Sequence, residues 1–325
     1  MQKQHYETLT IRARRMSLQS RGLSQLKQLE RLCCATLIVL LCFIGGQAQD
    51  QPSSAWATDI GGRYWVQPDI VYLGANNTPL KLDVWYQHGV TTPTPTLVYI
   101  HGGGWIFGTK EASVLYFLPF LEKGWTVVNV EYRMASNSLA PAAVEDTRCA
   151  LRWVYRNASQ WHFDTTKIVL TGHSAGGHLA LITGMLPDGT PLDNRCYGEE
   201  KLKVAAIINW YGISDVNDLM KGVNLKNYAA MWVGSQPDAE EIARRVSPLT
   251  YVRSGLPPIL SIHGDKDDVV PYSHSVRLHE ALEKEKVPNQ LLTIKNGGHG
   301  LFSQADSVRS YEAIWAFLRQ NRVIN

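Results

Sequence analysis

The stretch IVLTGHSAGGH, residues 168–178, decides the fold. Its first three residues are apolar on both faces, as in a buried parallel strand, and residues 178–185 have the spacing of a helix. Between them, residues 172–176 fit the G-x-S-x-G pattern, in which a tight turn presents a serine hydroxyl at the start of a helix. Small residues must flank that serine because the turn leaves no room for side chains. We therefore predict a strand–turn–helix unit with Ser174 as a nucleophile.

Apolar runs and helix-length segments alternate on both sides of this unit. We expect eight strands, at residues 69–73, 80–86, 97–100, 126–130, 168–170, 204–208, 259–262 and 290–294. Helices are expected at residues 142–156, 178–185, 273–284 and 307–319. The alternation predicts right-handed crossovers and an α/β fold, a doubly wound and mostly parallel sheet with helices on both faces. The segment from about Ser214 to Ser254 breaks the alternation, and we expect a small cap inserted over the carboxyl edge of the sheet.

The composition is that of a protein with a sizeable core. Of the 325 residues, 45% are apolar and 19% are charged, which excludes a disordered chain. The formal net charge of +3 comes from 32 basic and 29 acidic residues, a balance that argues against a nucleic-acid partner.

The N-terminal segment has the order of a secretory signal peptide. A region rich in arginine and lysine precedes the apolar run Leu32–Ile44, which is shorter than the roughly 20 residues of a membrane-spanning helix. We predict a signal peptide over residues 1–48, with cleavage after Ala48 and a possible true start at Met16. The mature chain, residues 49–325, would be one catalytic domain that is secreted or periplasmic, without stable membrane association. The alternative is an uncleaved membrane anchor.

Cysteine usage agrees with export. Cys33, Cys34 and Cys42 fall in the signal segment, so the mature chain keeps Cys149 and Cys196. Two thiols in an oxidising compartment can pair. The sequence alone does not decide between a Cys149–Cys196 disulfide and two free thiols.

A serine nucleophile needs a base, and we expect a histidine near the C-terminus. His299 lies in the glycine-flanked loop NGGHG, residues 296–300, directly after the last expected strand. His263 ends a strand and is expected to be structural, while His274 and His279 fall on an expected helix and should be solvated.

The acid that orients the base should lie between the serine and the histidine in the chain. The stretch SIHGDKDDVVP, residues 261–271, follows an expected strand and offers Asp265, Asp267 and Asp268. Spacing alone does not separate these three carboxylates.

Attack on a carbonyl creates an alkoxide that needs preorganised donors. The stretch HGGGW, residues 101–105, follows a strand and fits the HGGG-type oxyanion loop. We assign the donors to the backbone amides of Gly103, Gly104 and Ala175, with His101 as a brace. A phosphate cradle is the alternative, but the loop lacks the G-x-G-x-x-G and P-loop patterns.

Together these residues resemble the α/β-hydrolase superfamily, in its esterase branch with an HGGGW loop. The stretches YIHGGGWIFG (99–108), PAAVEDTRCALRW (141–153) and WYG (210–212) are similar to secreted bifunctional acetylxylan/feruloyl esterases, and the likeness spans most of the mature chain. That family's HGxxDxxVP pattern falls on residues 263–271 and places its aspartate on Asp267. Tyr132-Arg133 is followed here by MASNS, residues 134–138, where the hormone-sensitive lipase branch commonly continues its YR motif with a Leu-Ala-Pro-Glu run, and this difference argues against that branch.

The resemblance implies a serine esterase that removes acetyl or feruloyl groups from plant cell-wall polysaccharides such as xylan. The Ser174–His299–Asp267 triad would act through an acyl-enzyme without metal or cofactor. Trp105, Trp210 and Tyr211 are either stacking platforms for the acylated sugar substrate or core residues. The alternatives are an arylformamidase-like or peptidase-type amide hydrolase and a non-catalytic ligand-binding relative.

Overall fold

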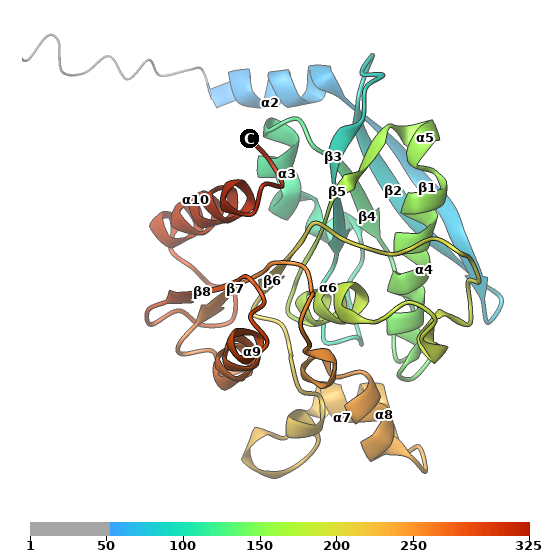
Figure 1. Cartoon of the computed structure of the whole chain (residues 1–325), viewed down its shortest axis with the longest axis vertical. Helices are drawn as coiled ribbons and strands as arrows, with labels where there is room; N and C mark the ends of the chain where they lie inside the picture. The colour runs from blue at the N-terminus through green and yellow to red at the C-terminus, as the bar shows by residue number, and fades with distance from the viewer. Residues whose placement is uncertain (1–52) are drawn as a thin grey trace, which may run out of the picture. The chain divides into compact units, whose positions relative to one another are not determined.

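The computed structural model describes residues 53–325 (Figure 1). The predicted signal segment, with its three cysteines, lies outside these residues. The chain divides into two compact units, residues 1–59 and 60–325, and helix α2 (Ser53–Arg63) crosses the boundary. The second unit is described below. Within residues 53–325, no helix is both long enough and apolar enough to cross a bilayer.

An eight-stranded sheet forms the centre of this unit, in the order β1-β2-β4-β3-β5-β6-β7-β8. Its strands are β1 (Tyr64–Ala75), β2 (Thr78–Gln87), β3 (Thr94–Ile100), β4 (Thr126–Val130), β5 (Phe163–His173), β6 (Ala206–Trp210), β7 (Ile259–Gly264) and β8 (Asn289–Ile294). β1 pairs antiparallel with β2, and β2 with β4, whereas all other neighbours are parallel. The predicted doubly wound, mostly parallel sheet is confirmed.

Side chains alternate between two cores because successive residues of a strand point to opposite faces. On β3, Leu97 and Tyr99 enter the core under α3 (Val114–Glu122) and α10 (Gln304–Gln320). Val98 and Ile100 enter the other core, under α4 (Ala142–Arg156), α6 (Ala175–Met185) and α9 (Ser273–Lys284). Figure 1 shows these two helix layers on either side of the sheet.

Two of the expected helices, α4 and α9, have the bounds that the sequence predicts, but α3 was not expected. Its sequence, VLYFLPFLE, is apolar almost throughout, so it shows no amphipathic stripe. Leu115 and Tyr116 remain exposed while Phe117 and Phe120 are buried. Only packing against the sheet decides which of these apolar residues face inward.

The segment 214–254 carries α7 (Asn227–Val233) and α8 (Ala239–Arg245), joined by short 3-10 turns. We call this segment the cap. Lys226 Nζ donates to the carbonyl of Asp268 at 2.6 Å, and the Tyr228 hydroxyl donates to the carbonyl of Val269 at 3.0 Å. These bonds fasten the cap to the loop after β7, at the carboxyl edge of the sheet.

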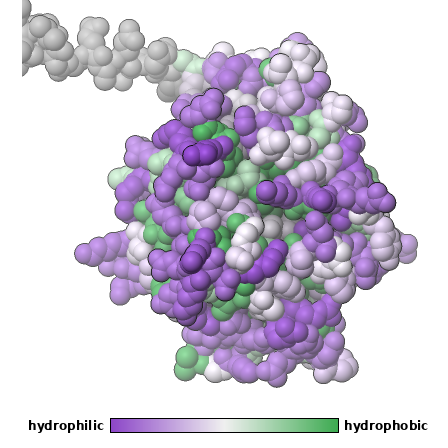
Figure 2. All heavy atoms as spheres, in the orientation of Figure 1, coloured by the Kyte–Doolittle hydropathy of each residue, from purple (hydrophilic) through white to green (hydrophobic). Residues whose placement is uncertain are grey.

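Figure 2 shows mainly hydrophilic residues on the viewed face, with apolar residues in small patches.

Cys149 and Cys196 form a disulfide, with their Cα atoms 5.5 Å apart. This resolves the choice that the sequence left open. The bond ties α4 to the loop before β6. Beside it, the buried Arg148 guanidinium pairs with Asp193 at 2.7 Å.

Candidate active site

Ser174 stands at the turn between β5 and α6. Its backbone angles, φ 56° and ψ −120°, are strained for a residue with a side chain, at a typical cost of about 1–3 kcal/mol. Glycine is required around it: a Cβ on Gly172 would lie 2.4 Å from the Ile100 carbonyl oxygen, and one on Gly176 only 2.1 Å from the same oxygen. Because the end of β3 approaches the turn so closely, only glycine fits at positions 172 and 176. The turn places the serine hydroxyl beyond the carboxyl edge of the sheet.

The structure brings together the three side chains that were predicted as a triad. His299 Nε2 lies 2.9 Å from Ser174 Oγ, and His299 Nδ1 lies 2.7 Å from Asp267 Oδ2. The residues follow β5, β7 and β8, whose carboxyl ends share one edge of the sheet. Proton transfer from the serine through the imidazole is geometrically possible without rearrangement.

Asp267 is held by four donors. Its Oδ1 accepts the amides of Val269 at 2.9 Å and Val270 at 2.8 Å, while Oδ2 faces His299 and also His263 Nε2 at 3.2 Å. Burial alone would raise the pKa of this carboxyl, but the hydrogen bonds from His263 and His299 lower it well below its usual range. Asp267 therefore stays ionised.

The two neighbouring carboxylates have other contacts. Asp265 Oδ1 accepts the Asn296 amide at 2.6 Å, and Asp268 is bound through its backbone carbonyl to the cap. Neither has a hydrogen bond to His299 among the described residues. Tertiary structure thus separates three aspartates that sequence spacing left equivalent.

His263 is a positioning residue, a role beyond the purely structural one that its place at a strand end suggests. Its Nε2 faces two acceptors, Asp267 Oδ2 at 3.2 Å and the Val270 carbonyl at 3.1 Å, so we assign the proton to Nε2. Its Nδ1 then accepts from the Ser275 hydroxyl at 2.7 Å. The side chain is fully buried, and its donor helps to orient the carboxylate. The spacing of four residues between His263 and Asp267 is the sequence feature that could have indicated this contact.

The expectation that His274 and His279 are solvated is wrong. Their exposed fractions are 0% and 6%, because they lie on the inner face of α9. His274 Nδ1 accepts the Ser214 amide at 3.2 Å, and His279 Nδ1 lies 2.7 Å from Asn289 Oδ1. Both have structural contacts and neither reaches the triad.

The glycine loop lies against the nucleophile. A Cβ on Gly102 would be 3.6 Å from Ser174 Cβ, and Gly103 and Gly104 have φ values of 115° and 58°. Among the described residues, the amides of Gly103 and Gly104 donate to no other backbone or side-chain group. Ala175 is the first residue of α6, where an amide has no intrahelical acceptor. The three amides predicted as donors are thus free to bind an oxyanion.

His101 occupies the position expected of a brace. Its ring stacks on Tyr132 with centroids 4.4 Å apart, and its Nδ1 lies 2.7 Å from the Gly102 carbonyl oxygen. The Tyr132 hydroxyl donates to the His101 carbonyl at 3.0 Å. Burial lowers the pKa of His101 to about 4, so the ring remains neutral while it supports the loop.

Trp105 is fully buried, so of its two predicted roles the structure favours the core. It stacks on Trp232 of the cap with centroids 4.1 Å apart, and its Nε1 donates to His178 Nδ1 at 3.2 Å. His178 Nε2 then donates to the carbonyl of Val246 at 2.7 Å, and burial lowers the pKa of His178 to about 4. The cap therefore fastens the glycine loop through Trp105.

Trp210 and Tyr211 are also nearly buried, with exposed fractions of 5% and 6%. Trp210 stacks on His173 at 5.0 Å, and burial lowers the pKa of His173 to about 3. The Tyr211 ring meets His299 edge-on at 4.7 Å, and its φ of 40° is strained. Its hydroxyl has no hydrogen-bond partner among the described residues and would lie 2.4 Å from a Cβ on Gly300. Trp210 thus packs as core, whereas Tyr211 keeps a free hydroxyl beside the triad.

We refer to His101, His173 and His178 as the buried histidine set. Each supports the site while remaining neutral. Within residues 53–325, no group of three or more His, Cys, Asp or Glu side chains lies in a metal-binding arrangement.

Known proteins resemble this chain in sequence and in fold. The BD-FAE family model matches residues 82–282. Esterase LipC of Mycobacterium tuberculosis is 28% identical over 251 residues, which cover 74% of this chain and 62% of LipC. The chain therefore spans less than two thirds of that relative.

Among solved structures, the thermophilic esterase Est2 of Thermogutta terrifontis is 27% identical with a TM-score of 0.65, covering 81% of this chain and 93% of Est2. The bifunctional GH43-CE of Bacteroides eggerthii is 27% identical with a TM-score of 0.67, covering 78% of this chain and 38% of the other. The family match extends over most of the sheet and includes Ser174 and Asp267. The chain has the α/β-hydrolase fold and belongs to the BD-FAE family.

Proposed function

We propose that this protein is a serine carboxylesterase that removes acetyl or feruloyl groups from plant cell-wall polysaccharides such as xylan. The observation that carries the proposal is the continuous hydrogen-bonded series from Ser174 Oγ through His299 to Asp267, at 2.9 and 2.7 Å. A serine held this way beside free backbone amides can attack a carbonyl and stabilise the resulting charge.

The reaction follows from the contacts. His299 Nε2 takes the proton of Ser174 as Oγ attacks the acyl carbonyl, and the oxyanion binds the amides of Gly103, Gly104 and Ala175. His299 then gives the proton to the departing sugar oxygen, which leaves the acyl group on the serine. Water, activated by the same imidazole, releases the acid. Asp267 stays ionised and stabilises the imidazolium that forms in both halves.

The substrate class rests on the family and on the site surface. LipC and Est2 are named esterases, and the similar Bacteroides eggerthii protein is described as a bifunctional GH43-CE. Phe107 is 67% exposed, and its ring lies 3.2 Å from the position of a Cβ on Gly103. Phe107 therefore presents an exposed ring next to the glycine loop. The Tyr211 hydroxyl offers a donor or acceptor to the sugar side. The predicted signal peptide would place the enzyme outside the cytoplasm, where the polymer occurs.

The test measures acyl release by the mature chain, starting at Gln49, and by its Ser174→Ala variant. Acetylated xylan, methyl ferulate, p-nitrophenyl acetate and an aryl formamide are compared. Ser136→Ala is the matched control, because this serine is exposed and outside the site. Acetate or ferulate release that needs Ser174 supports the proposal. Preference for the formamide favours amide hydrolysis, and activity that survives Ser174→Ala excludes the mechanism.

A further inference from the structure

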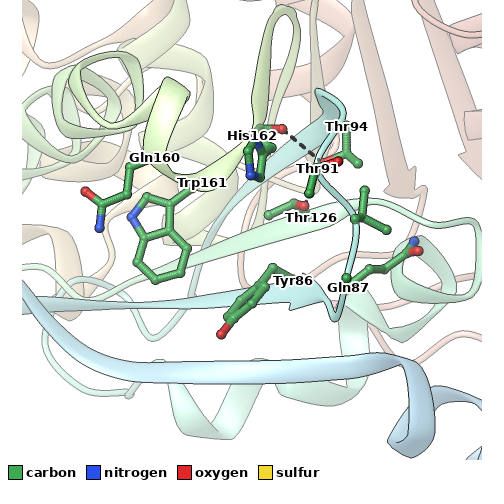
Figure 3. Close-up of a pocket in the computed structure, with 10 residues that line it drawn as sticks. Tyr86, Gln87, Thr91, Thr94, Thr126, Gln160, Trp161 and His162 are labelled. Carbon is green, nitrogen blue, oxygen red and sulfur yellow. Dashed lines mark hydrogen bonds between the residues drawn. The ribbon is translucent and has the colours of Figure 1, made fainter.

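A cavity of about 330 Å³ opens at the edge of the sheet opposite the triad. It lies where β2 ends and where β3, β4 and β5 begin, as Figure 3 shows. This volume is in the range of small-molecule sites. One wall includes Thr91 and Thr94 from the stretch TTPTPT, residues 91–96, which leads into β3 and has no part in the proposed mechanism.

Two aromatic rings form one side of the cavity. Tyr86 of β2 and Trp161 of α5 (Ala158–Trp161) meet edge to face with centroids 5.4 Å apart, and both are only partly buried. Figure 3 shows both rings on the same side of the cavity, facing Thr91, Thr94 and Thr126. Partly buried rings of this kind offer an apolar surface to the C–H groups of a ligand.

The opposite side is polar and held in place. The hydroxyls of Thr94 and Thr126 are 2.7 Å apart, and the Thr94 amide donates to the His162 carbonyl at 2.8 Å. On the aromatic side, Figure 3 shows the Gln160 side chain beside Trp161; its amide is exposed and has no hydrogen-bond partner among the described residues. Hydroxyl and amide groups can both donate and accept, as hydroxyl-rich ligands require.

Among the described residues, the cavity lining contains no Asp, Glu, Lys or Arg, and its titratable side chains are Tyr86 and His162. A charged ligand would find no counter-charge there, which disfavours phosphates, carboxylates and amines. An uncharged ligand with alternating C–H faces and hydroxyls fits the lining. We propose that this cavity is a second binding site, for a segment of a neutral oligosaccharide chain.

The place of the cavity indicates what such a site would do. β3 has seven residues and connects the two edges, so at about 3.3 Å per residue the cavity lies roughly 20 Å from the triad. A small ester cannot contact both places, whereas a polysaccharide can. Binding at the second site would raise the effective concentration of the polymer's acyl groups near Ser174. The choice of polymer rests on the proposed function.

Direct binding tests the proposal independently of catalysis. Calorimetry would measure binding of xylohexaose and soluble arabinoxylan to the Ser174→Ala protein, with Trp161→Ala or Gln160→Ala added. We expect either added change to weaken binding, Trp161→Ala by roughly tenfold. Gln160 has no partner to lose, so its variant should fold even if Trp161→Ala does not. The matched control is Trp65→Ala, because Trp65 is 53% exposed, stacks on His88 at 4.1 Å and is not among the described residues that line the cavity.

Kinetics distinguish this site from the proposed function. In the active protein, Trp161→Ala should lower the ratio of acetylated-xylan to p-nitrophenyl acetate activity by several-fold, while Trp65→Ala leaves it unchanged. If the protein binds sugar in a way that depends on Trp161 but deacylates no xylan, the second binding site is supported and the proposed substrate is excluded. Unchanged affinity in both the Trp161→Ala and Gln160→Ala proteins, or no binding of either sugar, overturns the proposal.

Discussion

Replacing Asp267 by asparagine should inactivate the enzyme although the two side chains have nearly the same shape. The amides of Val269 and Val270 donate to Oδ1 at 2.9 and 2.8 Å, so the asparagine oxygen must occupy that position. Its NH₂ group then takes the place of Oδ2 and faces His299 Nδ1. A donor there requires an unprotonated Nδ1, which puts the proton on Nε2.

The wrong tautomer cannot accept the proton of Ser174, because its Nε2 already carries one 2.9 Å from Oγ. Such a tautomer in a Ser-His-Asp triad costs about 10⁴-fold in kcat. That factor corresponds to about 5.4 kcal/mol of activation free energy. The substituted NH₂ also faces the His263 donor, so the variant should lose some stability as well.

The assay compares kcat and KM for p-nitrophenyl acetate between pH 6 and 9, with thermal unfolding as a check on folding. The kcat of Asp267→Ala should lie within tenfold of the kcat of Asp267→Asn, because an asparagine that keeps the shape of the aspartate does not restore the correct histidine tautomer. Asp265→Asn is the control and should keep wild-type activity, because Asp265 bonds to the Asn296 amide and not to the triad. Activity of Asp267→Asn within a hundredfold of wild type would refute the assignment.

Four further predictions concern positioning and stability. His263→Ala removes one of four donors to the carboxylate, so kcat should fall roughly tenfold with little change in KM; an unchanged kcat would leave this residue a purely structural role. Gly300→Ala should lower kcat by at least tenfold, because Gly300 has a φ of 73° and the added Cβ would lie 2.4 Å from the Tyr211 hydroxyl, next to His299. Gly298→Ala is its control and should keep wild-type kcat, because its Cβ would meet nothing within 4 Å. Removing the disulfide by Cys149→Ala with Cys196→Ala should lower the free energy of unfolding by about 4 kcal/mol, from its separation of 47 residues; an unchanged urea midpoint contradicts this. The buried histidine set has pKa values of about 3 to 4, against an ordinary 6.5. Between pH 6.5 and 4 the unfolded chain therefore binds protons that the native state does not. As the pH is lowered through this range, the free energy of unfolding should decrease by up to about 1.4 kcal/mol per pH unit for each histidine. Urea unfolding at pH 7, 5.5 and 4.5 measures this slope, and a flat profile would contradict it.

Local patterns were sufficient for the fold. Apolar runs on β3 to β8 and the amphipathic spacing of α4 and α9 are short-range features, and each is readable from a few adjacent residues. Helix α3 was missed because its nearly uniform apolar sequence carries no periodicity, so its orientation depends on the sheet beneath it. The cap was predicted as an insertion at about residues 214–254, but its short helices α7 and α8 were not, since contacts outside each helix stabilise them.

The sequence by itself determined Ser174, His299 and the glycine loop, because a tight turn and converging amides require small residues at fixed spacing. It could not choose among three aspartates by spacing, decide whether Cys149 pairs, or place Trp105. Those outcomes depend on groups distant in the chain: the His299 imidazole, the loop that carries Cys196, and the Trp232 ring. Spacing along the chain limits which residues can be neighbours in a turn, whereas contacts between strands, loops and the cap exist only after the sheet has brought its carboxyl ends to one edge.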